Sequence, residues 1–533
     1  MLRRLLAVAV LMVAACVAAP ASAFADGVAT PRWVWIKSKD GAPIHSLVVV
    51  PKHTAPGVKR PAVAFAAAWN GGAEQNTVPA YRLAQRGYVV VSYTTRGTGK
   101  DGKGKINMGG PKDVEDMQAV IDWMLANQPV DEQRIGAAGI SYGAGIALIT
   151  AAVDKRIRSV ASMSGWTDLG RALYPHETRN SWAGFILWAS ARTASHVDGD
   201  FLRVFKNFFS NRDTEDTLAF ARGRSPVTYI DQLNANRPAV MLSQNWNELA
   251  FPPDQIIDYF QQITGPKLML LRPGDHVGQE TLGEVGFYNP VFNRLYRWFD
   301  DTLATPEKRE AAGSRIEIQP RAPEGERQLE TYTDWSQVST GTRRWYLGGV
   351  ANRRGDSAMG DAPATGWSTT LKPGYNAVNY AGGPIISHWT EVWWGRPMWG
   401  DPNVVDRKST AMWFSPPVTD WVRLRGEPRI HLTITPTHRV GTIVPVLWSV
   451  GADGKARHIT HAPYTWRNAT PGKPFTLDLP LRPNAFNVPP GHRILLATST
   501  WEANYFFEKN PMGSRITFGS PEGDPAWIEL PTR

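Results

Sequence analysis

The residues with the clearest potential for chemistry lie at positions 134–144, which read R-I-G-A-A-G-I-S-Y-G-A. Ser141 stands there between Gly139 and Gly143, at the end of a short apolar run. The spacing G-x-S-x-G is typical of a nucleophile elbow, a tight strand-to-helix turn that exposes a serine hydroxyl. Glycines two positions before and after the serine let the strand and the helix approach closely. The pattern predicts that Ser141 attacks the carbonyl carbon of an ester or amide.

The sequence on either side of Ser141 supports this prediction. The motif alone is weak evidence, because a chain with 48 glycines can contain G-x-S-x-G by chance. Residues 135–140 form a strand-like run, and residues 142–153 are small or aliphatic, which favours a buried helix. An ordinary glycine-rich turn between a strand and a helix is the alternative.

A serine nucleophile needs a histidine base, and three histidines follow in the region of strand–helix alternation: His176, His196 and His276. His276 belongs to R-P-G-D-H-V-G, directly after the predicted strand 267–271. A loop at the carboxyl edge of the sheet would present it to Ser141. His176 and His196 lie where the alternation is interrupted. We therefore expect His276 to be the base, with an exposed loop histidine as the alternative.

The acid that orients this histidine should follow the preceding strand, in S-Q-N-W-N-E-L-A-F-P-P-D-Q. Glu248 is our prediction, because it stands a few residues before the Pro-Pro pair that opens the next helix. Asp254 is the rival, but a residue just inside that helix would face its N-terminal amides as a capping charge. Asp275 is adjacent to His276 in the chain and is poorly placed to orient it.

Acyl transfer also needs two donors aimed at the developing oxyanion. The backbone N–H of Tyr142, supplied by the elbow itself, is the first candidate. The second is expected from the loop after the predicted strand 62–68, at the amide of Trp69 or Asn70. The alternative for that loop, W-N-G-G, is a plain glycine turn.

These residues need a frame, and the first part of the chain alternates strands with helices. Between the predicted strand 157–164 and the predicted strand 238–243, residues 166–237 break the rhythm and are rich in Trp, Phe and Arg, which indicates an inserted helical cap. The alternation predicts a mostly parallel sheet covered on both faces. The other strands expected are 44–51, 62–68, 88–93, 135–140 and 266–271, and the helices expected are one ending at 86, 113–125, 142–153, 252–263 and 285–301.

Past residue 303 we expect a polar linker and then short strands separated by Pro and Gly turns. Residues 429–435, 444–451, 475–479 and 493–498 alternate or run apolar at close spacing, which suits an antiparallel sandwich or jelly roll. The predicted domains are an α/β domain at 26–335, with the cap at about 166–237, and an all-β domain at 336–533.

Residues 1–25 are typical of a signal peptide, with two arginines, an apolar stretch and a small-x-small cleavage site ending at Ala23 or Ala25. We expect an exported protein, with lipidation of Cys16 as the less favoured alternative. Cys16 is the single cysteine, which excludes disulfides and cysteine-built metal sites from the mature chain. No cofactor or metal is expected, and no other stretch is apolar enough to span a membrane.

The formal net charge of +10 raises the question of nucleic acid. Lys and Arg are scattered, however, and form no long basic run or aromatic-interleaved patch. A solvated basic surface is the interpretation, and nucleic acid is not expected as a partner.

With these motifs in place, the chain resembles the X-prolyl dipeptidyl-peptidase and cocaine esterase family of serine hydrolases, which includes acyl esterases and α-amino acid ester hydrolases. The segments that carry the likeness are 134–144, V-V-V-S-Y-T-T-R-G-T-G before it, the P-G-D-H loop, and P-P-G-H-R-I-L-L at 489–496. The resemblance implies an α/β-hydrolase domain with a helical cap and a C-terminal jelly roll around one cleft, with acyl-enzyme chemistry. Ser141 matches the family's nucleophile and His276 its base.

Two departures from the family pattern concern the acid and the oxyanion loop. The family usually has aspartate as the acid, often two residues after a tryptophan, and here Glu248 holds that place after Trp246. Family members often use a tyrosine hydroxyl in the first oxyanion loop, where this chain has Trp69. Its indole N–H or a backbone amide would have to substitute.

The resemblance implies a small-molecule ester or a short peptide as substrate. A dipeptidyl-peptidase would need cap acids to hold a free α-amino group, and the available acids are Glu177, Asp198, Asp200, Glu215 and Asp216. The competing hypothesis is a carbohydrate- or cell-wall-binding protein with an inert hydrolase domain, suggested by H-W-T-E-V-W-W-G-R-P-M-W at 388–399. Those tryptophans are also explained by packing in a core or an interface.

Overall fold

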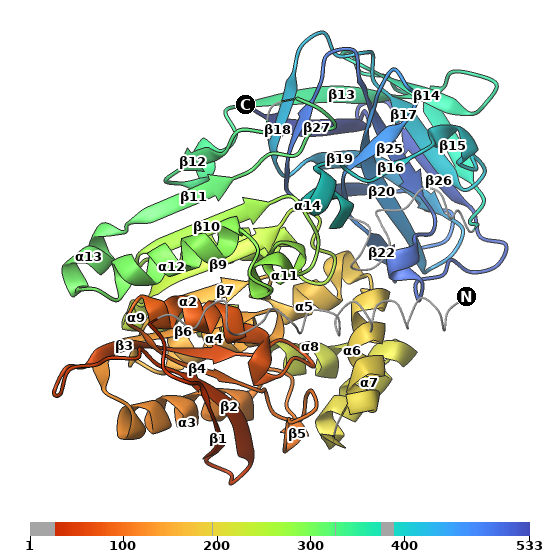
Figure 1. Cartoon of the computed structure of the whole chain (residues 1–533). Helices are drawn as coiled ribbons and strands as arrows, with labels where there is room; N and C mark the ends of the chain where they lie inside the picture. Colours follow the sequence, from red (N-terminus) through yellow and green to blue (C-terminus); the bar gives the residue numbers. More distant parts are fainter. Residues whose placement is uncertain (1–26, 195, 326, 375–388) are drawn as a thin grey trace.

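The structure is a computed structural model, and it describes residues 27–194, 196–325, 327–374 and 389–533. The predicted signal peptide at 1–25, including Cys16, lies outside the described residues. Figure 1 shows an α/β part, coloured red to green, beside an all-β part, coloured teal to blue. The predicted fold class is confirmed: an α/β-hydrolase domain with a helical insertion, followed by a β-sandwich.

The first part is built on a ten-stranded sheet with the order β1-β2-β4-β3-β6-β7-β9-β10-β11-β12. The strands from β4 to β11 in this order are parallel, while β1, β2 and β12 pair antiparallel at the two edges. The strands are β1 (Arg32–Lys37), β2 (Pro43–Val49), β3 (Arg60–Ala66), β4 (Val89–Tyr93), β6 (Val130–Ile140), β7 (Ile157–Met163), β9 (Ala239–Asn245), β10 (Lys267–Arg272), β11 (Ser314–Ile318) and β12 (Glu330–Tyr332).

Helices cover both faces of this sheet, because the central strands are apolar on both sides. On β3, Ala62 and Ala64 join the core beneath one set of helices, and Val63 and Phe65 join the core beneath the other. The first set comprises α3 (Pro111–Asn127), α4 (Tyr142–Val153) and α10 (Pro253–Gln262). The second comprises α2 (Thr77–Gln85) and α12 (Pro290–Thr302).

One predicted helix, at 285–301, is present but begins later than expected. The structure has α11 (Gly278–Glu284), a short turn, and then α12. The side chain of Asn289 accepts a hydrogen bond from the N–H of Phe292 and so caps α12, and Pro290 takes the first helical position. Proline there fixes a helical φ and lacks an N–H that the first turn could not use, so a new helix begins at this point.

The polar linker expected after residue 303 is also wrong in part. The chain forms α13 (Pro306–Ala311) and then β11, which pairs parallel with β10 and extends the sheet. Ile316 and Ile318 of β11 are buried in the core of the α/β part. The alternation of charged and apolar residues in S-R-I-E-I is the local signal for this strand.

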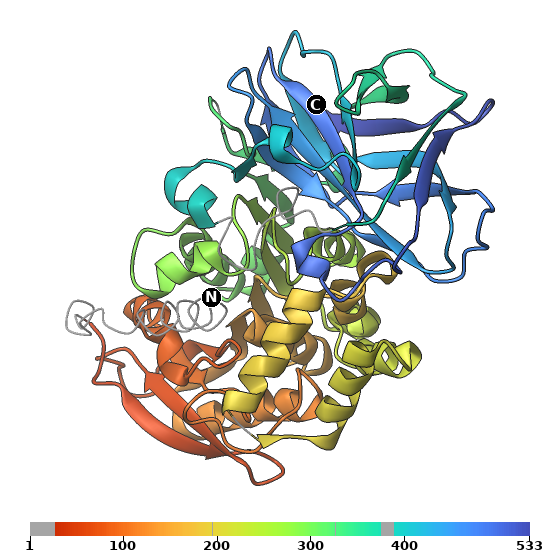
Figure 2. The same ribbon diagram turned by 90° about the vertical axis from the view of Figure 1, so that its right-hand side faces the viewer.

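The insertion between β7 and β9 is helical, as the sequence predicted. Figure 2 shows its longest helix, α6, in yellow along one side of the α/β part. Its last helix, α9, lies against α4, where Asn236 Nδ2 donates to the carbonyl oxygen of Ala152 at 2.7 Å. The elements are α5 (Leu169–Leu173), α6 (Ser181–Ala194), β8 (His196–Val197), α7 (Gly199–Ser210), α8 (Thr214–Arg222) and α9 (Ile230–Asn236), and β8 pairs with β5 (Lys105–Ile106).

The second part is a β-sandwich around its own apolar core. The four strands predicted from the sequence are present, as β19, β20, β23 and β25. All the strand pairs described in this part are antiparallel except β14 with β17. The strands are β13 (Gly341–Val350), β14 (Asp356–Gly360), β15 (Trp367–Leu371), β16 (Trp399–Gly400), β17 (Thr410–Phe414), β18 (Val422–Gly426), β19 (Arg429–Pro436), β20 (Gly441–Val450), β21 (Ala456–His461), β22 (Tyr464–Trp466), β23 (Phe475–Pro480), β24 (Asn484–Val488), β25 (Arg493–Ser499), β26 (Ile516–Ser520) and β27 (Trp527–Thr532), and the helix α14 (Trp389–Trp394) precedes β16.

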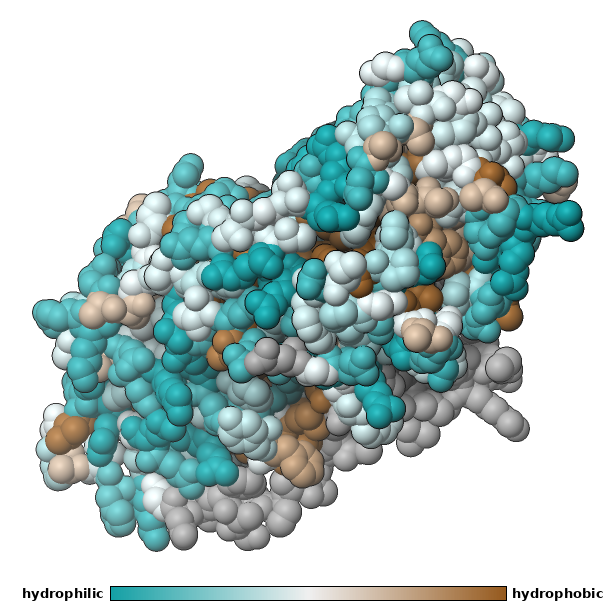
Figure 3. All heavy atoms as spheres, turned by 90° about the horizontal axis from the view of Figure 1, so that it is seen from above, coloured by the Kyte–Doolittle hydropathy of each residue, from teal (hydrophilic) through white to brown (hydrophobic). Residues whose placement is uncertain are grey.

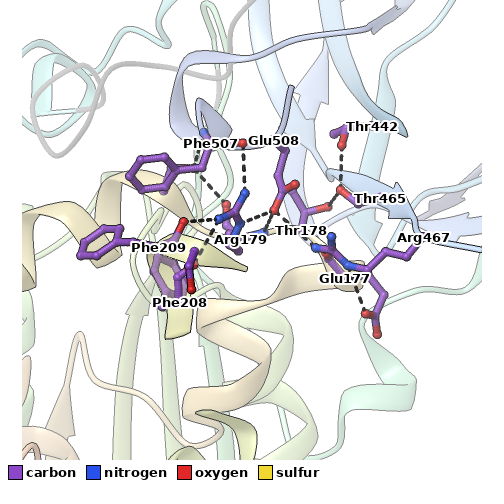
Figure 4. Close-up of polar contacts among 12 residues, drawn as sticks. Glu177, Thr178, Arg179, Phe208, Phe209, Thr442, Thr465, Arg467, Phe507 and Glu508 are labelled. Carbon is purple, nitrogen blue, oxygen red and sulfur yellow. Dashed lines mark hydrogen bonds and ion pairs between the residues drawn. The ribbon is translucent and has the colours of Figure 1, made fainter. Parts of the chain in front are cut away.

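A buried ion pair joins the cap to the sandwich (Figure 4). Arg179 Nε, just before α6, donates to Glu508 Oε1 at 2.6 Å, and both side chains are buried. The same guanidinium donates to the carbonyl oxygens of Phe208, Phe209 and Phe507. Because the bonds to Glu508 and Phe507 are charge-assisted and the ion pair is buried, they fix the cap against the sandwich, while those to Phe208 and Phe209 hold Arg179 within the cap.

Seen from above, the surface shows no large hydrophobic patch. Figure 3 shows a mostly hydrophilic surface on which hydrophobic residues form small separate patches. Within the described ranges, no helix has the length and hydropathy needed to cross a membrane.

In the sandwich, His431 of β19 lies between two carboxylates. Its Nδ1 is 2.6 Å from Asp478 Oδ1 and its Nε2 is 2.7 Å from Asp524 Oδ1. Its ring stacks on Trp527, with centroids 5.2 Å apart. Partial burial opposes protonation, but the hydrogen bonds to Asp478 and Asp524 outweigh it and raise the pKa of His431. The charged imidazolium therefore joins β19 to β23 and to the turn before β27.

We expect the substitution His431→Gln to lower the melting temperature of the sandwich more at about pH 5.5 than at about pH 9. Because the pKa of His431 is higher in the folded protein than in the unfolded chain, its stabilising contribution is complete below about pH 6.5 and is lost as pH rises through the folded pKa. Melting curves of the wild type and the variant across this range measure the effect. The exposed His53→Gln is the control, and an equal loss at both pH values would contradict the expectation.

Candidate active site

Ser141 lies at the sharp turn between β6 and α4. Its backbone has φ 53° and ψ −112°, a conformation that a non-glycine residue rarely adopts. Its N–H donates to the carbonyl oxygen of Met163 on the neighbouring strand β7 at 2.8 Å. Strained backbone of this kind persists only where the surrounding structure enforces it, and it marks functional sites.

The two glycines around Ser141 are required by space. A Cβ on Gly139 would lie 2.1 Å from the carbonyl carbon of Gly143, and a Cβ on Gly143 would lie 2.3 Å from the carbonyl oxygen of Ala66. Both contacts are with backbone, which cannot move aside. Only glycine at these positions lets α4 start directly against the ends of β6 and β3, so the spacing seen in the sequence has a steric cause.

The structure brings Ser141, His276 and Glu248 together at the carboxyl edge of the sheet. The hydroxyl of Ser141 lies 2.9 Å from Nε2 of His276, and Nδ1 of His276 lies 2.9 and 3.0 Å from the two carboxylate oxygens of Glu248. A carboxylate at Nδ1 keeps the proton on that nitrogen and leaves Nε2 free to accept the serine proton. Chemically, this arrangement can activate the hydroxyl as a nucleophile.

Glu248 is held on the loop after β9 by hydrogen bonds from its own backbone neighbours. Its Oε1 accepts from the N–H of Ala250 at 2.9 Å and from the N–H of Phe251 at 3.2 Å. The residue is completely buried. The longer side chain of glutamate curls back onto this turn, and it still reaches the imidazole.

His276 is more basic than an ordinary histidine. Burial lowers its affinity for a proton, but the charge and hydrogen bonds of Glu248, followed by the charge of Asp275, outweigh burial and raise the pKa of His276. A buried carboxylate at Nδ1 thus stabilises the imidazolium that forms when His276 takes a proton. Phe251 packs edge-on against the ring, with centroids 5.4 Å apart.

Asp275 has a role that sequence reasoning missed. Its Oδ1 accepts from the N–H of Leu249 at 3.0 Å and from the N–H of His276 at 2.8 Å, so it joins the acid loop to the histidine loop. Burial and the nearby charge of Glu248 raise the pKa of Asp275 to about 8. Asp275 is next to His276 in the chain, and only the folded structure shows that its carboxylate bonds to the backbone of both the acid loop and the histidine loop.

A second buried acid, Glu280, lies one helical turn after His276 on α11. Its side chain is fully buried, and burial raises its pKa to about 7. The charges of Glu248 and His276 both act on it. No pattern in the sequence distinguished this residue from a surface glutamate of a short helix.

The rival candidates lie elsewhere. Asp254 is partly buried on α10, where its Oδ2 accepts from Arg171 Nη2 at 2.6 Å, and it contacts neither His276 nor Ser141 in the described structure. His176 is exposed in a 3-10 turn of the cap, and His196 is exposed in β8.

The expected oxyanion donors differ in their surroundings. Tyr142 takes the first position of α4, where the helix makes no use of its N–H. The indole Nε1 of Trp69 donates to Ser190 Oγ of α6 at 2.8 Å, so it is already engaged with the cap. Asn70 has φ 59°, and its Oδ1 accepts weakly from the N–H of Gly99 at 3.5 Å. A backbone amide of this loop is therefore the better candidate for the second donor.

A small apolar cavity adjoins Ser141. It has room for one or two small groups. Its walls come from the oxyanion loop, the connection between β5 and α3, the elbow, the cap and the acid loop: Trp69, Met108, Tyr142, Trp166, Leu169, Leu187 and Phe251. No charged side chain lines it.

The five cap acids are engaged away from this cavity. Asp198 caps α7 by accepting from the N–H of Phe201. The others pair with arginines on the outside of the cap or at its border: Glu177 with Arg467, Asp200 and Asp216 with Arg203, and Glu215 with Arg222. The described structure therefore places none of them where it would hold the amino group of a substrate bound in the cavity.

The tryptophan-rich segment is described from residue 389 onward, so His388 lies outside the described residues. Trp394 and Trp399 are more than half exposed. The ammonium of Lys455 lies 4.4 Å from the ring centroid of Trp399, so one face of that ring is already covered.

The described ranges contain no group of three or more His, Cys, Asp or Glu residues arranged to hold a metal ion.

Two protein families match successive parts of the chain. Residues 40–278 match the X-Pro dipeptidyl-peptidase (S15 family), and residues 312–521 match the X-Pro dipeptidyl-peptidase C-terminal non-catalytic domain. The first match contains the elbow, the acid loop and His276, and the second contains most of the sandwich.

Solved structures share the whole architecture. An α-amino acid ester hydrolase has a TM-score of 0.71 at 16% identity, with 97% of this chain and 98% of that chain covered. A CocE/NonD family hydrolase from Staphylococcus aureus has a TM-score of 0.69 at 13% identity, with 95% and 93% covered. An aminopeptidase from a marine sediment Thaumarchaeota archaeon has a TM-score of 0.66 at 15% identity, with 94% and 96% covered. At these identities the likeness is one of fold.

Curated relatives match only over part of their length. An uncharacterized protein, YcjY of Escherichia coli strain K12, is 35% identical over 97 residues, which is 18% of this chain and 32% of that protein. An uncharacterized protein of Pseudomonas aeruginosa is 29% identical over 133 residues, 25% of this chain and 36% of that protein. The α/β part is thus similar to the X-Pro dipeptidyl-peptidase (S15) family of hydrolases and the sandwich to the C-terminal domain of X-Pro dipeptidyl-peptidases, on a fold that solved hydrolases share along nearly the whole chain.

Proposed function

We propose that the protein is an exported serine hydrolase that cleaves a carboxylic ester through an acyl-enzyme, with Ser141, His276 and Glu248 as its catalytic triad. The observation that carries the proposal is the continuous hydrogen-bonded series from the Ser141 hydroxyl through His276 to the buried Glu248 carboxylate. Export rests on the signal-peptide pattern of residues 1–25. Mass spectrometry of the protein recovered outside the cytoplasm tests export, because cleavage after Ala23 or Ala25 gives a mature chain of defined molecular mass.

The geometry supports a two-step reaction. Ser141 Oγ attacks the ester carbonyl carbon while His276 Nε2 takes its proton, and the carbonyl oxygen becomes an oxyanion facing the N–H of Tyr142. The intermediate collapses, the alcohol leaves with the proton from His276, and an acyl-enzyme remains. A water then attacks the acyl carbon, gives a proton to Nε2, and releases the acid as Ser141 recovers its proton. Throughout, Glu248 holds Nδ1–H and stabilises the imidazolium.

The substrate class follows from the walls around Ser141. The cavity is small and lined by apolar and aromatic side chains, which favours a short uncharged acyl group. A dipeptidyl-peptidase would need a carboxylate for the free amino group, and the five cap acids are capped or paired elsewhere. An ester with a short apolar acyl group is therefore the favoured substrate over an X-Pro peptide.

We expect a fluorophosphonate probe to label the wild-type protein and to leave Ser141→Ala unlabelled, because the probe reacts with an activated serine hydroxyl. Mass spectrometry of the labelled peptide identifies the modified residue. A correctly folded wild type that takes up no probe, or takes it up at another serine, would sink the proposal.

Among p-nitrophenyl esters, we expect acetate and propionate to give a higher kcat/KM than octanoate, because each added methylene must displace packed side chains of the cavity. Substrates of the X-Pro-anilide type should react at least about 100-fold more slowly than these esters, since the five cap acids are engaged elsewhere and do not hold their amino group. Steady-state kinetics on the purified mature chain decide this. Faster cleavage of X-Pro-anilides would reassign the substrate to peptides.

The substitution Glu248→Gln should lower kcat by about 10³- to 10⁴-fold, because an amide at this position no longer fixes the Nδ1–H tautomer. Asp254→Asn is the matched control, since Asp254 pairs with Arg171 and contacts neither His276 nor Ser141 in the described structure, and it should stay within about threefold of wild type. Circular dichroism checks that both variants fold. The reverse ranking of the two variants would reassign the acid to Asp254.

A further inference from the structure

The loop that carries Glu248 is held partly by the β-sandwich. Arg482, which follows β23, donates from Nη1 to the backbone carbonyl oxygen of Glu248 at 3.3 Å. Asn247 Nδ2 donates to Glu391 Oε2 of α14 at 3.3 Å. Two successive residues of the acid loop are therefore bonded to side chains more than a hundred positions further along the chain.

A third contact to this loop comes from the cap. Asn180 Nδ2 donates to the carbonyl oxygen of Leu249 at 2.7 Å. The loop is thus held by two other parts of the molecule, the sandwich and the cap, while the N–H groups of Trp246 and Asn247 tie it to the α/β part by donating to the carbonyl oxygens of Arg272 at 2.8 Å and Gly274 at 3.1 Å.

Arg482 is an unusual residue for an interior position. It is 7% exposed, and within the described ranges it forms no ion pair with a carboxylate. Its hydrogen bonds go to neutral acceptors, the carbonyl of Glu248 and the hydroxyl of Tyr505 at 3.0 Å. That hydroxyl is also 2.9 Å from His461 Nε2. A buried charge without an ion pair costs stability, so its place beside the acid loop calls for a reason other than stability.

Glu391 is fixed more firmly than Arg482. Both of its carboxylate oxygens lie 2.9 Å from Arg321 Nε, and both side chains of this pair are completely buried. Arg321 also donates to the carbonyl oxygens of His458 and Ile459 on β21. Asn247 therefore bonds to an acceptor that the sandwich itself holds in place.

The peptide group between Glu248 and Leu249 is held at both ends. Its carbonyl oxygen accepts from Arg482 of the sandwich, and its N–H donates to Asp275 Oδ1 beside His276. Because the peptide unit is planar, these two bonds fix its orientation. The orientation in turn sets where the side chain of Glu248 starts and where the N–H of Ala250 meets it.

We propose that Arg482 is a positioning residue of the catalytic triad, which fixes the Glu248–Leu249 peptide so that the carboxylate of Glu248 meets His276, with Glu391 acting in the same sense through Asn247. The inference rests on the proposed function for the meaning of the triad. It gives the sandwich, whose family is described as non-catalytic, a direct part in ordering the site.

The loss of Arg482 would act on the pKa of His276 in two opposite ways. Removing a nearby positive charge would raise the pKa of His276, whereas losing the ordered contact with Glu248 would lower it. The other titratable groups that act on His276 are Asp275 and Glu280, and neither contacts Arg482 in the described structure. The direction of the change therefore separates positioning from simple charge.

The test is an NMR titration of His276 in protein labelled at histidine Cε1, with His276→Gln to assign the signal. In Arg482→Gln we expect the pKa of His276 to fall by about 1, the size of one weakened charge-assisted hydrogen bond. Arg482→Lys keeps the charge and one donor, and it should recover part of this fall. Asn247→Ala leaves the Arg321–Glu391 pair intact, and it should also lower the pKa of His276. This variant provides the test if Arg482→Gln fails to fold.

Kinetics give the second measurement. Arg482→Gln should lower kcat about 10- to 100-fold with little change in KM, because orientation of the imidazole affects the transition state more than binding. Arg425→Gln is the matched control: Arg425 is a completely buried arginine of the sandwich that bonds to Glu330 and Asn487, away from the acid loop. It should leave both the kcat and the pKa of His276 near wild type.

The outcomes separate the two proposals. An unchanged or raised pKa of His276 in Arg482→Gln, or an equal loss of kcat in Arg425→Gln, overturns the positioning role. If the pKa falls as expected but the wild type fails to react with the fluorophosphonate probe, the role of Arg482 in ordering Glu248 stands and the proposed serine mechanism is wrong.

Discussion

The contact between Glu248 and His276 is the interaction on which the rest of the site depends. It places a fully buried carboxylate against an imidazole, and such a charge is tolerated only when donors surround it. The donors here are His276 Nδ1–H and the N–H groups of Ala250 and Phe251. Since two of the three belong to the same loop as the acid, the shape of that loop decides whether the carboxylate is correctly aimed. The hydroxyl of Ser141 gains a base only if this condition is met.

Three parts of the molecule meet at the carboxyl edge of the parallel sheet. The α/β domain supplies the strained turn at Ser141 and the loops after β9 and β10. The cap holds Leu249 through Asn180 and engages Trp69 through Ser190, and the sandwich holds Glu248 through Arg482. Because the strands are parallel, their C-terminal loops emerge on one side, and an insertion and an appended domain can both reach them there.

The polarity of the cap is arranged for the same site. Apolar side chains of the cap, such as Leu187, face the cavity beside Ser141. The acids at α7 and α8 instead cap a helix or form ion pairs with Arg203 and Arg222. Charges paired at the outer surface contribute little to stability, but they keep the outside of the cap hydrated. The consequence for chemistry is an apolar cavity in which an oxyanion is strongly stabilised by its few donors.

The sequence by itself determined the alternating α/β frame, the helical insertion, the four strands of the sandwich and the order of Ser141, Glu248 and His276. These features follow from local periodicity and from loops that come directly after strands. It placed the start of the helix at 285–301 too early, since Asn289 and Pro290 begin that helix, and it left Glu248 and Asp254 as rivals. Only the tertiary structure decided that Asp254 pairs with Arg171, that the Trp69 indole is engaged by Ser190, and that Asp275 and Arg482 hold the acid loop. Arg482 and Glu248 are 234 positions apart in the chain. A hydrogen bond over such a separation leaves no pattern in the local sequence, because other polar residues at either position would suit the local secondary structure equally well.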